Sequence, residues 1–358
     1  MSVAAKHTLP LFPGRLRGAA RAVLAFGMTV GIAIGLAGLS MGSRAAPAAS
    51  LTVLMGDDSA AHSEFVQQLR ASQEPGGRFE LVRLSPGGDM PQAVETAGAE
   101  PERANAGVRT RSVRPSSDAG LTMAVGIAAA RAAVERPGQE PLVLAMLSRL
   151  DYETLKAGSP ALKRGDRRVG VLLRDPAMAD QLALIGAALP QKHRIGVVAT
   201  PESEPLVREL LRAAQGANPA WDVRVEYAPD AKSLAAALRT VVPQSDALMV
   251  LPDLIGDNQA ATLSVLRAGA GAGLPVFGAS EGLVRSGGLA AAVSTPSQLA
   301  QQARLLGQKV AAATGGNNGP LVEAATPATV RVNATVARGL GLRLPEEREL
   351  TDRLAAAR

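Results

Sequence analysis

The sequence predicts an α/β protein of two doubly wound lobes, each built on a largely parallel sheet. Short apolar runs alternate with helix-forming segments from residue 51 to the C-terminus, which gives about eleven strands. Runs such as Ile195–Ala199 are apolar throughout, as expected for strands buried on both faces. The length of 358 residues is enough for two cores.

The first 48 residues have the pattern of a secretory signal peptide. Basic residues precede the apolar run Val23–Gly42, and the small residues Ala46–Ala48 form an A-x-A cleavage site. A retained membrane anchor is the alternative, because the run approaches the roughly 20 residues that span a bilayer. Either reading predicts a protein exported to the periplasm.

Charge and composition exclude several classes of function. Of the 38 basic residues, five lie in the first 48 residues, and the others nearly balance the 32 acidic residues. No basic stripe with interleaved aromatic residues occurs, so we expect no nucleic-acid partner. The chain has no cysteine, and its three histidines lie far apart in the sequence. We therefore expect neither a metal site nor a cofactor.

The expected strands follow one another with a helix between most neighbours. Pro86–Asp118 interrupts the pattern as an exposed loop with one weak helix near Met90–Ala97. The strands are expected at 51–55, 79–84, 121–125, 141–147, 168–173, 195–199, 221–227, 247–251, 274–277, 289–293 and 328–332.

Polar residues follow several of these strands, and open α/β sheets bind ligands beyond the carboxyl ends of their strands. We therefore predict that these exit-loop residues bind a ligand. They are Asp57, Ser59, Ser148, Arg149, Asp253, Asn258, Ser280 and Glu281.

Two of these candidates also have a purely structural alternative. Asp57 could receive an amine, or serve in a turn or as a helix cap. Arg149 could pair with a ligand carboxylate, or with Asp151 or Glu153 at the surface. Asp253 could hold a ligand amine.

Residues 245–308 resemble the substrate-binding proteins of one ABC-transporter family, which includes tryptophan- and tyrosine-type periplasmic binding proteins. The resemblance rests on the order of Pro252-Asp253, Asn258, Pro275–Ser280, Gly287–Ala291 and the Gln-rich Gln298–Gln308. It extends more weakly from about Leu51 to the C-terminus.

A second matching segment, DPAMADQLALIGAALP, departs from the family at Ala179-Asp180, where an Arg or an aromatic residue is common. The departure puts a shared ligand in doubt.

The resemblance implies the type I periplasmic binding protein fold, in which the chain crosses between the lobes three times. We expect crossings near 175–180, 281–288 and 327. Lobe one then comprises residues 49–174 and 287–326, and lobe two comprises residues 175–286 and 327–358. The implied partners are a small-molecule ligand held between the lobes and an ABC permease in the inner membrane.

We expect no enzyme, because the chain has no nucleophile elbow, P-loop or zinc-protease motif. Aromatic residues are too scarce for a ring clamp, so the expected ligand is small or aliphatic. The alternative is a degenerate binding-protein fold that serves as a partner-binding, sensor or accessory protein. Such a protein would have a cleft lined by Ala and Gly rather than by convergent polar groups.

Overall fold

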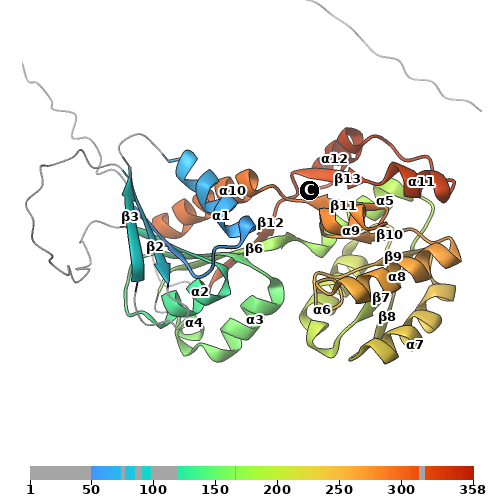
Figure 1. The fold of residues 1–358 in the computed structure, drawn as a ribbon, viewed down its shortest axis with the longest axis horizontal. Coiled ribbons are helices and arrows are strands. Elements are labelled where there is room, and N and C mark those ends of the chain that lie inside the picture. The colour runs from blue at the N-terminus through green and yellow to red at the C-terminus, as the bar shows by residue number, and fades with distance from the viewer. Residues whose placement is uncertain (1–49, 74–76, 85–90, 98–119, 166, 314–318) are drawn as a thin grey trace, which may run out of the picture. The chain divides into compact units, whose positions relative to one another are not determined.

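Two mainly parallel sheets form the framework of the chain (Figure 1). The computed structural model describes residues 50–73, 77–84, 91–97, 120–165, 167–313 and 319–358. The expected signal peptide and most of the expected loop at 86–118 lie outside these residues. Among the described residues, no helix is both long enough and apolar enough to cross a bilayer.

The first sheet has seven strands within the described ranges, in the order β12-β6-β5-β4-β1-β2-β3. All neighbours pair in parallel except β2 and β3. The strands are β1 Ser50–Met55, β2 Arg78–Leu84, β3 Pro91–Ala97, β4 Leu121–Val125, β5 Leu142–Leu147, β6 Val169–Pro176 and β12 Leu321–Ala325.

The second sheet has six strands in the described part of the chain, in the order β13-β11-β10-β9-β7-β8. Only β11 and β13 pair antiparallel. The strands are β7 Arg194–Ala199, β8 Asp222–Tyr227, β9 Ala247–Met249, β10 Val276–Gly278, β11 Ala290–Val293 and β13 Thr329–Val332.

Helices cover both faces of the first sheet, as the doubly wound prediction requires (Figure 1). One face packs against α1 and α10 around fully buried Phe65 and Leu306. The other packs against α2, α3 and α4 around Ala129 and Leu162. The helices are α1 Ala60–Ala71, α2 Gly126–Glu135, α3 Arg149–Gly158, α4 Pro160–Arg164 and α10 Pro296–Ala312.

The second sheet is covered in the same way. One core lies between the sheet and α5, α6, α11 and α12, and the other between the sheet and α7, α8 and α9. These helices are α5 Met178–Ala188, α6 Glu204–Gly216, α7 Ala231–Val241, α8 Gln259–Ala272, α9 Glu281–Arg285, α11 Ala334–Gly339 and α12 Glu347–Ala356. Two 3₁₀ turns, Pro201–Ser203 and Val242–Gln244, complete the elements of the described residues.

Over the ranges that the structure describes, the chain passes between the sheets three times. It leaves the first sheet after β6, returns between β11 and α10, and leaves again between β12 and β13. The first and third passages lie near the expected positions, but the second follows Val293 rather than residues 281–288. Residues 290–293, which the expected boundaries give to lobe one, therefore belong to the second sheet. Their apolar pattern suits either sheet, and pairing with β10 and β13 decides between them.

The prediction of a weak helix near Met90–Ala97 is wrong. Pro91–Ala97 forms β3, which pairs antiparallel with β2 at the edge of the first sheet. Proline is tolerated at the first residue of an edge strand, where the ladder needs no N–H from it. The edge of β2 supplies backbone partners that the isolated segment lacks.

Candidate functional site

Four of the predicted site residues are helix N-caps. Ser59 accepts a hydrogen bond from the His62 N–H at 3.4 Å and begins α1. Ser148, Asn258 and Ser280 begin α3, α8 and α9 in the same way. The backbone N–H of Ser148 also donates to the Asp151 side chain at 3.3 Å, which completes a capping box. Each cap stabilises its helix by about 1 kcal/mol.

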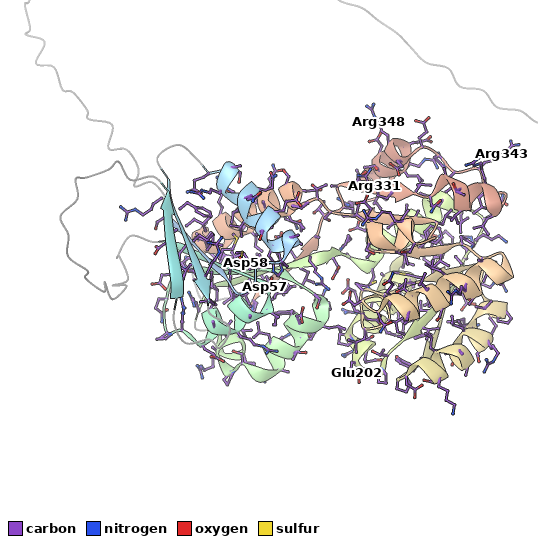
Figure 2. All side chains as sticks on the ribbon, viewed as in Figure 1. Asp57, Asp58, Glu202, Arg331, Arg343 and Arg348 are labelled. Carbon is purple, nitrogen blue, oxygen red and sulfur yellow. The ribbon has the colours of Figure 1, made fainter. Side chains whose placement is uncertain are left out.

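Asp57 and Asp58 lie together in the loop after β1 (Figure 2). Asp57 is 2.8 Å from His62 Nδ1 and accepts the Ser59 N–H at 3.1 Å. Burial opposes ionisation of Asp57, but these bonds outweigh burial and lower its pKa. Asp58 pairs with Arg83 at 3.3 Å.

The charged candidates beside two of these caps also have protein partners. Arg149 pairs with Glu209 at 2.9 Å and lies 3.9 Å from Glu153. Glu281 lies 3.9 Å from both Arg285 and Arg331. The pairing of Arg149 with Glu153 was one of the structural alternatives, whereas Glu209 was not foreseen.

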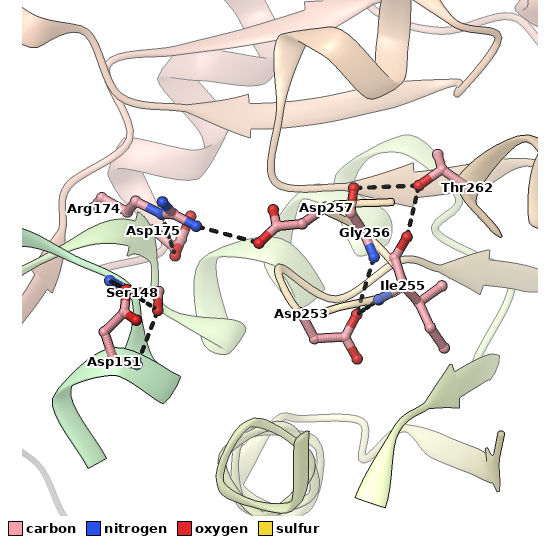
Figure 3. A network of polar contacts seen from close by, with 9 residues as sticks. All are labelled: Ser148, Asp151, Arg174, Asp175, Asp253, Ile255, Gly256, Asp257 and Thr262. Atoms are coloured by element: carbon pink, nitrogen blue, oxygen red, sulfur yellow. Dashed lines mark hydrogen bonds and ion pairs between the residues drawn. The ribbon is translucent and has the colours of Figure 1, made fainter. Parts of the chain in front are cut away.

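Asp253 shapes the loop that follows β9 (Figure 3). Its side chain is only 1% exposed and accepts the N–H groups of Ile255 and Gly256 at 2.9 and 3.1 Å. Ser203 donates to its other oxygen at 2.5 Å. Burial raises the pKa of Asp253, although these hydrogen bonds oppose the rise.

The other side of the same loop is equally constrained. Thr262 donates to the carbonyl groups of Ile255 and Gly256 at 3.0 and 3.3 Å. A side chain at Gly256 would collide with the carbonyl oxygen of Leu251. The loop is therefore held from both sides, and it presents Asp257 outward with 63% of its side chain exposed.

A pocket of about 230 Å³ lies where strands from both sheets end. Its walls come from the end of β6 and from the loops after β9 and β10, which is where open α/β sheets bind ligands. The lining residues are Arg174, Asp175, Val250, Leu251, Pro252, Gly256, Asp257, Gly278, Ala279, Ser280 and Leu283.

Three charged groups face this pocket (Figure 3). Arg174 Nε lies 3.6 Å from Asp175 Oδ2, and Arg174 Nη2 lies 3.6 Å from Asp257 Oδ2. Both separations are longer than a hydrogen bond, so the guanidinium links the two carboxylates loosely. Asp175 Oδ2 is buried and accepts no hydrogen bond from the described residues.

Asp175 is strongly perturbed. Burial raises its pKa to about 6, Arg174 opposes the rise, and Asp257 and Asp151 add to it. Although 19% of the Asp175 side chain is exposed, its Oδ2 atom is covered by protein. Ionisation of the carboxyl group therefore places negative charge on an oxygen that water does not reach, which costs free energy. A carboxylate that is costly to ionise, beside a pocket, is typical of a functional position.

The structure brings only part of the predicted set to this pocket. Ser280 lines it, and Asp253 holds the loop that forms one wall. Sequence reasoning missed Arg174, Asp175 and Asp257. A signal was present, because Arg174-Asp175 ends an apolar strand just as Asp253 follows one. Whether any of the eight predicted residues contacts a ligand stays a prediction.

A larger groove of about 520 Å³ lies between α7 and α8. Its lining is mainly apolar, with Arg239 and Arg267 as the charged members, and it contains no carboxylate. Because it is formed by helices rather than by strand ends, we place the candidate site at the smaller pocket. No cluster of three or more potential metal-ligating side chains occurs in the described part of the chain.

Two parallel-rich sheets joined by three passages, with a polar pocket at their strand ends, define a two-lobed binding protein. The chain belongs to the ABC transporter substrate binding protein family, whose model matches residues 120–351. It is therefore a substrate-binding protein of an ABC transporter, which binds a ligand and is not an enzyme. A comparison with curated proteins finds no match.

Solved structures support the same fold. One is the ligand-free, open structure of a substrate binding protein with adhesive properties from Clostridium difficile. It is 16% identical, with a TM-score of 0.57, and the match covers 83% of this chain and 96% of that one. A conserved domain protein from Vibrio cholerae is 19% identical, with a TM-score of 0.50 and coverage of 85% and 98%. At these identities the likeness shows the fold alone.

The contrast between Asp253 and Asp257 is testable. Asp253→Ala removes the acceptor of the Ser203 hydroxyl and leaves the buried Ile255 N–H and the part-buried Gly256 N–H without one, and should lower the free energy of unfolding by about 2–4 kcal/mol. Asp257→Ala removes a mostly exposed carboxylate and should change it by less than about 0.5 kcal/mol. Urea denaturation measures both values, and equal losses would contradict the structural role of Asp253.

A second prediction concerns pH. Because folding raises the pKa of Asp175 from 3.8 to about 6, the folded state binds this proton more tightly than the unfolded state. The contribution of this proton to the free energy of unfolding is fully present below pH 3.8 and is lost as pH rises through 6. Relative to that of Asp175→Asn, the free energy of unfolding of the wild type should fall by up to about 3 kcal/mol between pH 4 and 7. Urea denaturation at several pH values measures this difference, and a constant difference would refute it.

Proposed function

We propose that this protein is the periplasmic solute-binding component of an ABC-type uptake system and that it captures a small molecule between its two lobes. The single observation that carries the proposal is the pocket whose walls come from both sheets. Arg174 and Asp175 belong to β6 of the first sheet, and Asp257 and Ser280 follow strands of the second. Closure of two lobes on a ligand would bring such groups onto it from opposite sides.

The charges of the pocket favour a ligand with a protonated amine. Two carboxylates face one guanidinium, and Asp151 lies close enough to raise the pKa of Asp175 further. An ammonium group in the pocket could pair with the carboxylate of Asp175, whose buried oxygen accepts no hydrogen bond from the described residues. It would also offset the cost of ionising this carboxyl, so a cation and Asp175 would stabilise one another.

The size and lining of the pocket favour a small or aliphatic ligand. None of the lining residues is aromatic. The nearest aromatic residue in sequence, Phe277, is 1% exposed and packs in the core of the second sheet. A ring would therefore find no stacking partner in the pocket, in keeping with the expectation that the ligand is not aromatic.

Export and the membrane partner complete the proposal. The signal pattern of residues 1–48 supports a periplasmic location, and membership of the family supports an inner-membrane permease as partner. The alternative of a degenerate, partner-binding fold expects a cleft lined by Ala and Gly. The convergence of Arg174, Asp175 and Asp257 weighs against it.

Thermal unfolding of residues 49–358 against a panel of compounds tests this function. The panel contains diamines and other primary amines, amino acids, small carboxylates and nucleosides. A ligand present at a hundred times its dissociation constant should stabilise the protein by about 2.7 kcal/mol. We expect the shift with amine-bearing compounds, and we expect Asp175→Asn to abolish it.

Asp352→Asn is the matched control, because it removes one carboxylate from an exposed position on α12. It should leave the ligand-induced shift unchanged. If the protein unfolds cooperatively and no compound shifts its melting, the solute-binding proposal fails and the partner-binding alternative takes its place. If only carboxylates shift it, the site binds a ligand but the amine assignment is wrong.

A further inference from the structure

An ion pair away from the candidate pocket connects helices that cover different sheets. Arg149 is the first residue of α3, on the first sheet, and Glu209 lies on α6, on the second. Arg149 Nε and Nη2 donate to Glu209 Oε2 at 3.0 and 2.9 Å. The side chains are only 23% and 20% exposed, so water screens this pair less than it screens surface ion pairs.

Glu209 has a second role at the first passage between the sheets. Its Oε1 accepts the Met178 N–H at 3.2 Å, at the first residue of α5. The preceding residue, Ala177, offers no side-chain cap to this helix. The Glu209 carboxylate thus accepts the otherwise uncapped N–H of Met178, beside the first passage between the sheets, and also binds Arg149 of the first lobe.

An apolar contact supports the same junction. Leu150, the residue after Arg149, is half-buried and packs against the core beneath the second sheet. The start of α3 therefore meets the second lobe through a charged side chain and an apolar one.

The backbone before Arg149 is strained. Met146 has a φ of 62°, in the left-handed region that a side chain disfavours, and the pairing of β5 with β6 shifts register between Ala145 and Leu147. The capping box of Ser148 and Asp151 follows at once. Such strain persists only where the surroundings impose it. Here it sets the direction in which the chain leaves β5, and so the position of Arg149.

We propose that Arg149 and Glu209 form an interlobe clasp, which holds the lobes in the arrangement where Arg174, Asp175 and Asp257 face one pocket. Neither residue lines that pocket, so both act as positioning residues. The consequence for affinity rests on the proposed function. Ligand affinity falls in proportion to the fraction of molecules whose lobes are arranged to bind, so loss of the clasp would weaken binding without removing a ligand contact.

The arrangement of the lobes can be measured without a ligand. The chain has no cysteine, so Gln67→Cys on α1 and Ala236→Cys on α7, both exposed, would carry a unique pair of spin labels. In this background we expect one narrow distance distribution. Arg149→Met and Glu209→Gln should each broaden it or shift it to a new distance. Arg149→Lys, which keeps the charge but loses the two-nitrogen fork, should give an intermediate result.

Arg353→Met is the matched control, because Arg353 pairs with Glu349 at 2.6 Å within α12 alone. It should leave the distribution unchanged. If Arg149→Met fails to fold, Arg149→Lys and Glu209→Gln provide the same comparison. Distributions that match the background in every clasp variant would overturn the proposal, whatever the ligand panel shows.

With a ligand from the panel, Arg149→Met should raise the dissociation constant, by at most about fivefold, because a lost contact of about 1 kcal/mol lowers the ratio of binding to non-binding arrangements by about that factor. Asp175→Asn should instead abolish binding and leave the distance distribution unchanged. A failed solute-binding proposal and a failed clasp would therefore give different results.

Discussion

Parallel pairing of buried strands is the constraint on which the site depends. Each sheet is covered by helices on both faces, so its strands offer almost no surface for polar side chains except where they end. Because the strands are parallel, several of these ends lie at one edge of each sheet. The ends of β6, β9 and β10 accordingly supply the Arg174-Asp175 pair, the loop that carries Asp257, and Ser280.

Two aspartates near this edge show how local hydrogen bonding separates a structural role from the proposed ligand-binding role. Asp253 is more deeply buried, yet both of its oxygens accept hydrogen bonds, so its charge fixes the loop. Asp175 has a loosely held arginine beside it and a covered oxygen that accepts nothing. Burial of a carboxylate without enough donors is costly, and the proposed cationic ligand would offset this cost.

The clasp and the pocket share one framework. Strands β5 and β6 are neighbours, and the register shift at Met146 lies opposite Leu172 and Leu173, just before Arg174. The same strand pair therefore directs Arg149 towards α6 and places Arg174-Asp175 in the pocket. Glu209 contacts the chain again at Met178, directly after β6. A change in the arrangement of the lobes would consequently alter both the Arg149–Glu209 ion pair and the pocket.

The sequence by itself determined the alternation of strands and helices, the doubly wound class, and the position of the polar strand exits. Periodicity reports which residues are buried, and caps such as Ser148 and Asn258 have local signals. Only the tertiary structure decided that β11 joins the second sheet, that Pro91–Ala97 pairs with β2, and that Arg174 meets Asp257. These outcomes join segments far apart in the chain. Their free energies come from packing and backbone pairing between those segments, which no local pattern of residues records.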